Sequence, residues 1–210
     1  KERVVSVICV MTAFHATYAQ TIHARNMYLP EDFAFDHKFV DVTTQLTSEA
    51  VLERTDASDQ QYGTRVVITN TTIGYSKCGC GGVAYVGVFD MTGPDHEYYQ
   101  PAWVFEQGLG SGPKNLAEAA SHEAGHNLGL SHDGTSKTGY YAGQGAWAPI
   151  MGVGYYEPIT QWSKGEYTGA NNKEDDFVVM QGYGLSLRSD PEGSSAATAV
   201  PLAASGSTYT

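Results

Sequence analysis

The stretch AASHEAGHNLGLSHDG, Ala119–Gly134, constrains the fold of this 210-residue chain more than any other feature. It contains three of the chain's seven histidines, His122, His126 and His132. Residues four apart lie on one face of a helix, so His122 and His126 can direct two imidazoles at one ion. His132 comes six residues later and would lie on the opposite side of a continuous helix. The helix must therefore end before His132 if the three side chains are to meet.

Gly129 supplies that helix end, because glycine adopts the left-handed conformation of a helix C-terminus without steric cost. The helix is predicted to begin near Pro113, since proline is tolerated at the first helical position and Ser111 or Gly112 can cap it. Most residues in between are good helix formers. We therefore predict a helix from about Pro113 to Gly129, after which the chain doubles back and carries His132 toward the same ion.

The residues in this pattern suit a catalytic metal site. Three neutral imidazoles around Zn²⁺ leave a fourth position open for water, unlike the closed shell of a structural zinc. Glu123 is one step round the helix from His122, so it lies beside the ion without being a ligand. Zinc lowers the pKa of its water toward ~7, and Glu123 can accept the proton as the water attacks a carbonyl. The spacing predicts His122, His126 and His132 as zinc ligands and Glu123 as the general base.

The string HEAGHNLGLSH resembles the zinc signature of the metzincin metallopeptidases. Metzincins also carry a methionine in a tight turn beneath the metal, and the downstream segment WAPIMGVGYY offers Met151 for that place. Asp133 follows the third histidine, as in the adamalysin/reprolysin-like branch. The resemblance covers roughly Val4–Gln181 and implies a zinc-dependent endopeptidase that hydrolyses peptide bonds in proteins.

Two departures from the family pattern narrow the resemblance. Animal adamalysins have several disulfides in this domain, which Cys9, Cys78 and Cys80 cannot reproduce, so bacterial secreted members are the closer comparison. Astacins and serralysins place a metal-directed tyrosine two residues after the methionine, where this chain has Val153. The CGC sequence is compatible with a local disulfide, a pair of soft-metal ligands or one half of a bridge to Cys9. A zinc site there would lack further ligands at the usual spacing, so plain structural cysteines are favoured.

The resemblance implies an α/β (α+β) fold, the metzincin catalytic domain: a twisted, mixed five-stranded sheet, an active-site helix, a C-terminal helix and a loop-rich lower subdomain. Residues 1–188 are assigned to this domain and residues 189–210 to a Ser/Thr/Ala-rich tail or linker. Apolar runs and turn signals predict the remaining elements. These are strands at Val4–Val10, Lys38–Thr44, Arg65–Asn70, Val83–Phe89 and Ala102–Glu106, and helices at Ala13–Tyr28 and, capped by Asn172, at Lys173–Gln181.

The charge balance indicates which partners to expect. The net charge is −11, and no cluster of Lys or Arg is present, so a nucleic-acid partner is not expected. No apolar run reaches the ~18 residues that span a bilayer, and no membrane partner is expected. An acidic surface fits solubility outside cells. The resemblance adds a secreted, extracellular location, protein or peptide substrates and a monomeric state.

The segment before the zinc helix is predicted to bind substrate. The run GGVAYVGVF, Gly81–Phe89, is apolar and stands where the family has its edge strand at the cleft, and an exposed edge pairs with a peptide backbone. The side chain after the cut would enter a pocket walled by Gly152–Pro158. The candidate cleft residues are Gly82, Val83, Ala84, Tyr85, Tyr155 and Tyr156.

Two alternatives remain beside these predictions. The chain can be a catalytically silent zinc-containing binding module with a metzincin fold, although such a module has no need of Glu123 beside an open metal site. Acidic residues also offer calcium (Ca²⁺) ligands, although none has EF-hand spacing and solvated acids are the competing interpretation. These residues are Asp175, Asp176, Asp190 and Glu192.

Overall fold

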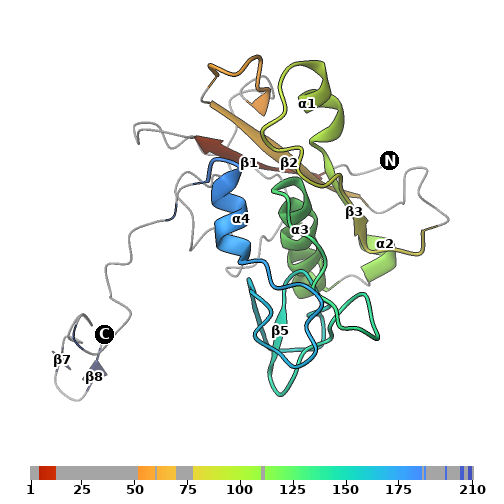
Figure 1. Cartoon of the computed structure of the whole chain (residues 1–210), viewed down its shortest axis with the longest axis vertical. Coiled ribbons are helices and arrows are strands. Elements are labelled where there is room, and N and C mark those ends of the chain that lie inside the picture. The colour runs from red at the N-terminus through yellow and green to blue at the C-terminus, as the bar shows by residue number, and fades with distance from the viewer. Residues whose placement is uncertain are drawn as a thin grey trace.

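The computed structural model of the chain describes residues 5–12, 52–59, 61–69, 78–109 and 112–185, together with 187, 197, 204–205 and 208–209. A mixed sheet lies above two main helices, and a loop-rich region lies below them (Figure 1). In chain order the elements are β1 (Val5–Thr12), β2 (Gln61–Thr69), β3 (Gly82–Val83), α1 (Pro94–Tyr99), β4 (Ala102–Phe105), α2 (Glu106–Leu109), α3 (Pro113–Asn127), β5 (Trp147–Pro149), β6 (Ile159–Gln161), α4 (Asp176–Gly182), β7 (Ala204–Ser205) and β8 (Thr208–Tyr209).

Four strands form the main sheet in the order β1-β2-β4-β3. β2 pairs antiparallel with β1 and parallel with β4, and β3 pairs antiparallel with β4, with Gly82 opposite Val104. The predicted mixed sheet is therefore confirmed, and β3 lies at its edge among the described residues. The fifth predicted strand, Lys38–Thr44, and the predicted helix Ala13–Tyr28 lie outside the described residues.

The core forms where one face of the sheet meets α3. Alternate residues of a strand point to the same face, so Val66 of β2 and Val104 of β4 both turn toward the helix and are fully buried. Ala120 and Ala124 present small side chains on the facing side of α3 and let it approach closely. The same core continues below the helix to Met151.

Helix α3 ends as its sequence predicts. It spans Pro113–Asn127, and Gly129 has a φ of 90°, in the left-handed region. The amide of Leu130 donates to the carbonyl of Gly125 at 3.0 Å, the long hydrogen bond of a glycine-terminated helix end. A Cβ atom at Gly129 would also collide with the ring of Tyr183, which follows α4. Both backbone conformation and packing therefore require glycine at this position.

The predicted strand Val83–Phe89 was wrong beyond Val83. The amide of Gly87 donates to the carbonyl of His126 at 2.8 Å, and the amides of Val88 and Phe89 donate to that of Asn127 at 3.0 Å. These backbone groups are bonded to the end of α3 and are unavailable for a strand ladder. A long-range contact thus overrides the local apolar pattern, and β3 stays at two residues.

Helix α4 begins three residues later than predicted. Asp175 caps it, because its carboxylate accepts from the amides of Phe177 and Val178. The predicted cap, Asn172, instead accepts from the amide of Glu174 at 3.0 Å and closes a local turn. The predicted helix was therefore right in kind and wrong in its first residues.

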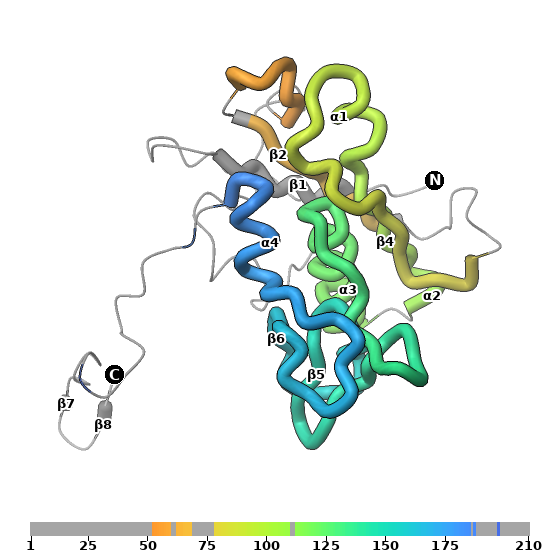
Figure 2. Tube along the Cα trace, viewed as in Figure 1, coloured from red at the N-terminus to blue at the C-terminus, as the bar shows by residue number. Residues whose placement is uncertain are grey.

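Several short elements were not predicted. Helices α1 and α2 are short, and β5 and β6 form a brief parallel pair within the predicted loop-rich lower subdomain. Figure 2 shows that the β5–β6 region lies below α3, on the side away from the sheet.

Cys78 and Cys80 form a disulfide, which selects the local-disulfide alternative for the CGC sequence. Among the described residues, no helix has the length and apolarity that a bilayer crossing requires.

Candidate metal centre

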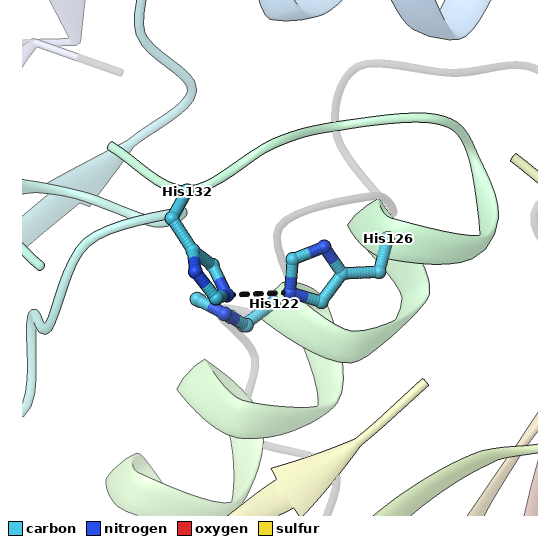
Figure 3. Close-up of side chains that lie close together, drawn as sticks. All are labelled: His122, His126 and His132. Carbon is cyan, nitrogen blue, oxygen red and sulfur yellow. Dashed lines mark hydrogen bonds between the residues drawn. The ribbon is translucent and has the colours of Figure 1, made fainter. Parts of the chain in front are cut away.

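Three histidines converge at the C-terminal part of α3. His122 and His126 extend from one face of the helix, and His132 reaches back from the segment beyond Gly129 (Figure 3). Each offers one ring nitrogen, and these three atoms lie within 4.8 Å of one another. The Nε2 atoms of His126 and His132 are 2.9 Å apart. The predicted meeting of the three side chains is thus present in the structure.

Backbone carbonyls orient two of the three rings. The Nδ1 atom of His122 donates to the carbonyl of Ile150 at 2.8 Å, and that of His126 donates to the carbonyl of Leu130 at 2.8 Å. With Nδ1 protonated and engaged, Nε2 carries the free lone pair in each ring. This is the arrangement by which proteins fix the tautomer of metal-binding histidines.

The surroundings keep the three imidazoles neutral. Burial lowers the pKa of His122 to about 3, with the neighbouring His126 adding to the effect. Burial and His126 likewise lower the pKa of His132 to about 4, and burial lowers that of His126. Neutral imidazole is the metal-binding form. The cluster therefore presents three unprotonated nitrogens at neutral pH.

Glu123 lies beside the cluster and against the edge of the sheet. Its side chain is buried, and burial raises the pKa of its carboxyl to about 8. A Cβ atom at Gly82 would come within 2.5 Å of Oε1 of Glu123, so the carboxyl group packs directly on the backbone of β3. A nearby dication would oppose the effect of burial and favour the ionised carboxylate. Glu123, the helical neighbour of His122, thus reaches the strand predicted to bind substrate.

Met151 lies in a tight turn under α3. The amide of Gly152 donates to the carbonyl of Pro149 at 3.1 Å, and the amide of Asp133 donates to the carbonyl of Met151 at 2.8 Å. The thioether packs against α3 at Gly125, where a Cβ atom would lie 2.8 Å from its sulfur. The turn therefore connects the residue that follows the third histidine to the underside of the helix.

The predicted cleft residues do not all gather at the histidines. Gly82 lies against Glu123, and the hydroxyl of Tyr155 lies near Gly81, at 3.3 Å from the position of a Cβ atom there. Tyr85 packs edge-on against Tyr99, with ring centroids 4.7 Å apart, at the end of α1. Tyr156 is 85% exposed. The sequence prediction thus combined residues at the centre with residues on its periphery.

The two predicted cleft residues that follow Gly82 in the chain, Val83 and Ala84, also differ in their surroundings. Val83 extends β3 by one residue, and Ala84 packs against the core at the point where the strand has ended.

Burial, followed by the charge of Glu123, raises the pKa of Tyr155 to about 12. Its phenol therefore stays protonated at neutral pH. It can donate a hydrogen bond at the edge of the site.

Tyr140 is a residue that the sequence analysis missed. Its ring centroid lies 4.3 Å from that of His132 and 6.0 Å from that of His122. The family pattern places a metal-directed tyrosine after Met151, whereas Tyr140 precedes Met151 in a loop with no periodicity. The only available signal was the GYY sequence between the last histidine and the methionine.

The donor set fits zinc. Zinc in catalytic sites takes three protein ligands at ~2.0–2.2 Å, commonly imidazoles, and keeps another position open. The three ring nitrogens lie within 4.8 Å of one another and are neutral, and two of the rings are hydrogen-bonded to backbone carbonyls. Glu123 is not a member of the cluster and remains available to act beside it.

The two candidate calcium ligands among the described residues make other contacts. Asp175 caps α4, and Asp176 accepts from the amide of Ser163 at 2.8 Å. Asp190 and Glu192 lie outside the described residues. Calcium therefore finds no support in these contacts.

A reprolysin-type family model, described as metallo-peptidase family M12, matches residues 11–163. The matched range covers more than half of the chain and includes the three histidines, Glu123 and Met151. No curated protein matches the chain closely enough to count as a relative.

Proposed function

Because the chain belongs to metallo-peptidase family M12, we propose that it is a zinc-dependent endopeptidase that hydrolyses peptide bonds in proteins. The observation that carries this proposal is the position of Glu123, buried beside three converging imidazoles and packed on the edge strand β3. A binding module that only held a metal would need no buried carboxyl at this place, because an unpaired carboxylate is costly to bury.

The proposed mechanism divides the work between the metal and Glu123. His122, His126 and His132 would hold Zn²⁺, which when bound supplies Lewis-acid polarisation of the scissile carbonyl and lowers the pKa of water. Glu123 accepts the proton of the attacking water and then delivers it to the amine that leaves. The orientation of His122 and His126 by backbone carbonyls keeps their Nε2 atoms directed at the centre throughout.

Substrate is proposed to bind as an extended chain along β3. Only the first part of the run Gly81–Phe89 can serve, because the amides of residues 87–89 already donate to the end of α3. The edge at Gly82 and Val83 lies next to Glu123, which would place the scissile bond beside the general base. Backbone pairing at a sheet edge binds peptides of many sequences, since it does not involve their side chains.

The pocket for the residue after the cut is proposed to lie against Gly152–Pro158. A polar network holds this segment to α3: Lys114 donates to the carbonyl of Gly154 at 3.0 Å and to Glu118 at 3.2 Å. Thr160 donates to the same Glu118 carboxylate at 2.6 Å. Glu118 stands four residues before His122, so this wall is attached to the helix face that carries the histidines.

The setting of the enzyme is also proposed. We infer a secreted, monomeric peptidase of the reprolysin-like type, closest to bacterial members, with its catalytic domain in residues 1–188. The support is the acidic composition, the M12 match and the presence of only three cysteines.

Digestion of an unbiased peptide library tests the proposed function. We expect internal cleavages by the zinc-loaded protein, with a preference at the position after the cut, because that side chain enters the pocket at residues 152–158. New termini are identified by mass spectrometry. A chain that binds zinc stoichiometrically and leaves every peptide intact would establish the silent binding module instead.

Gly82→Ala is expected to reduce peptide hydrolysis by up to ~10²-fold, because the new methyl group would displace the Glu123 carboxyl from its place. The methyl group would also press on the carbonyl of Trp103, and overpacking of this kind costs ~1–3 kcal/mol of stability. Kinetics and zinc content are measured together, with zinc expected to stay bound. Gly182→Ala is the matched control, since a Cβ atom there meets nothing within 4 Å. Wild-type kcat/KM in the Gly82 variant would show that β3 does not confine Glu123.

A further inference from the structure

The three histidines are held in two different ways. The Nδ1 atoms of His122 and His126 donate to backbone carbonyls, which fixes the plane of each ring. Within the part of the chain that the structure describes, His132 makes no such bond to a backbone carbonyl; its ring contacts are with His122, His126 and Tyr140. His132 is also half-buried and lies on a non-helical segment, so the helix backbone does not orient it. Something else must define the plane of this imidazole.

The ring of Tyr140 occupies the position that could do so. Its centroid is 4.3 Å from that of His132, and the two planes are inclined by 41°. Ring pairs at this separation are in direct contact and attract one another. The ring centroid of Tyr140 is also 6.0 Å from that of His122, so the tyrosine ring lies beside both His132 and His122. A rotation of the His132 ring toward Tyr140 would meet this aromatic surface.

The loop that carries Tyr140 is itself anchored to the centre. The amide of Tyr141 donates to the carbonyl of Asp133 at 2.7 Å, and the amide of Val153 donates to the carbonyl of Tyr141 at 2.9 Å. The ring of Tyr141 stacks on Tyr167, with centroids 4.1 Å apart and planes inclined by 6°. The backbone next to Tyr140 is therefore bonded both to the residue after His132 and to the residues after Met151. Tyr140 is held in place although 46% of its side chain is exposed.

We propose that Tyr140 is a positioning residue of the metal centre, whose aromatic ring holds the imidazole of His132 in its metal-binding orientation. The proposal rests on the proposed zinc site. It assigns the role to the ring and not to the hydroxyl, because the ring makes the contact with His132. Tyr140 thus fixes the ring orientation of His132, as the carbonyls of Ile150 and Leu130 fix those of His122 and His126.

The test compares Tyr140→Ala and Tyr140→Phe with the wild type in zinc affinity, measured by competition with a chromophoric chelator. We expect Tyr140→Ala to bind zinc about tenfold more weakly, the order found when a group that orients a metal ligand is removed. Tyr140→Phe should bind within about twofold of the wild type, because it keeps the ring contact. Tyr98→Ala, a tyrosine that is 70% exposed on α1, is the control and should match the wild type.

A spectroscopic measurement separates positioning from a general loss of stability. Cobalt(II) in place of zinc gives visible bands that depend on the ligand geometry, and these should change in Tyr140→Ala and be restored in Tyr140→Phe. Tyr140→Leu serves the same comparison if the alanine variant does not fold.

Wild-type zinc affinity and an unchanged cobalt spectrum in Tyr140→Ala would overturn the proposal, as would equal losses in the Phe and Ala variants. If the wild type itself binds no zinc, the proposed function fails first, which distinguishes the two.

Discussion

Glu123→Gln is expected to reduce peptide hydrolysis by at least ~10²- to 10⁴-fold, the usual contribution of a general base. Glutamine keeps the size and hydrogen-bonding reach of the side chain but cannot accept the proton of water. It also fits the space against Gly82 that the carboxyl group fills. Steady-state kinetics on a cleaved peptide measure the loss.

Zinc content and thermal stability separate this effect from damage to the site. Both should remain close to wild type, because the three histidines are untouched. Burial already disfavours the charged carboxylate of Glu123 in the metal-free protein, so a neutral amide is not expected to weaken the fold. A variant that holds its zinc and cleaves at the wild-type rate would exclude Glu123 as the base.

Removal of zinc by a chelator is expected to abolish proteolysis, and stoichiometric zinc is expected to restore it, because the proposed chemistry depends on one ion. The fold should persist without metal, since its core joins the sheet to α3 independently of the histidines. Activity and metal content are followed together during the titration. Fully active protein that contains no zinc would refute the proposed centre.

His126→Ala provides a genetic counterpart to the chelator. It removes one ligand and is expected to lose metal and activity together, whereas Glu123→Gln loses activity alone. This pair of variants distinguishes a residue that holds the metal from one that acts beside it. Equal zinc binding by His126→Ala and wild type would remove His126 from the ligand set.

Local rules explain why much of the centre could be predicted from the sequence. Helical spacing places His122 and His126 on one face, and a glycine helix end at Gly129 turns the chain back with His132. Both rules act over a few residues and need no knowledge of the rest of the fold. The strands of the sheet followed from apolar, β-branched runs such as that of β2, whereas their mixed arrangement was what the family resemblance implied.

Long-range contacts explain what could not be predicted. The apolar run after Val83 satisfies every local criterion for a strand, yet its amides bond to the end of α3 and end the ladder. Tyr140 lies against His132 because backbone bonds on either side of Tyr141 hold its loop there. Neither relation leaves a periodic trace in the sequence. Both relations arise from tertiary contacts between the region at the end of α3 and other segments of the chain.

The hydrogen bonds between residues 87–89 and the end of α3 couple movement in the two regions. Each bond contributes ~0.5–1.5 kcal/mol, and they are accepted by the carbonyls of His126 and Asn127. Displacing residues 87–89 would therefore pull on the backbone that carries His126. In the proposed cleft, adjustment to substrates of different bulk is then expected at residues 152–158. This segment is joined to α3 through the flexible side chains of Lys114 and Glu118, which can re-orient without moving the helix.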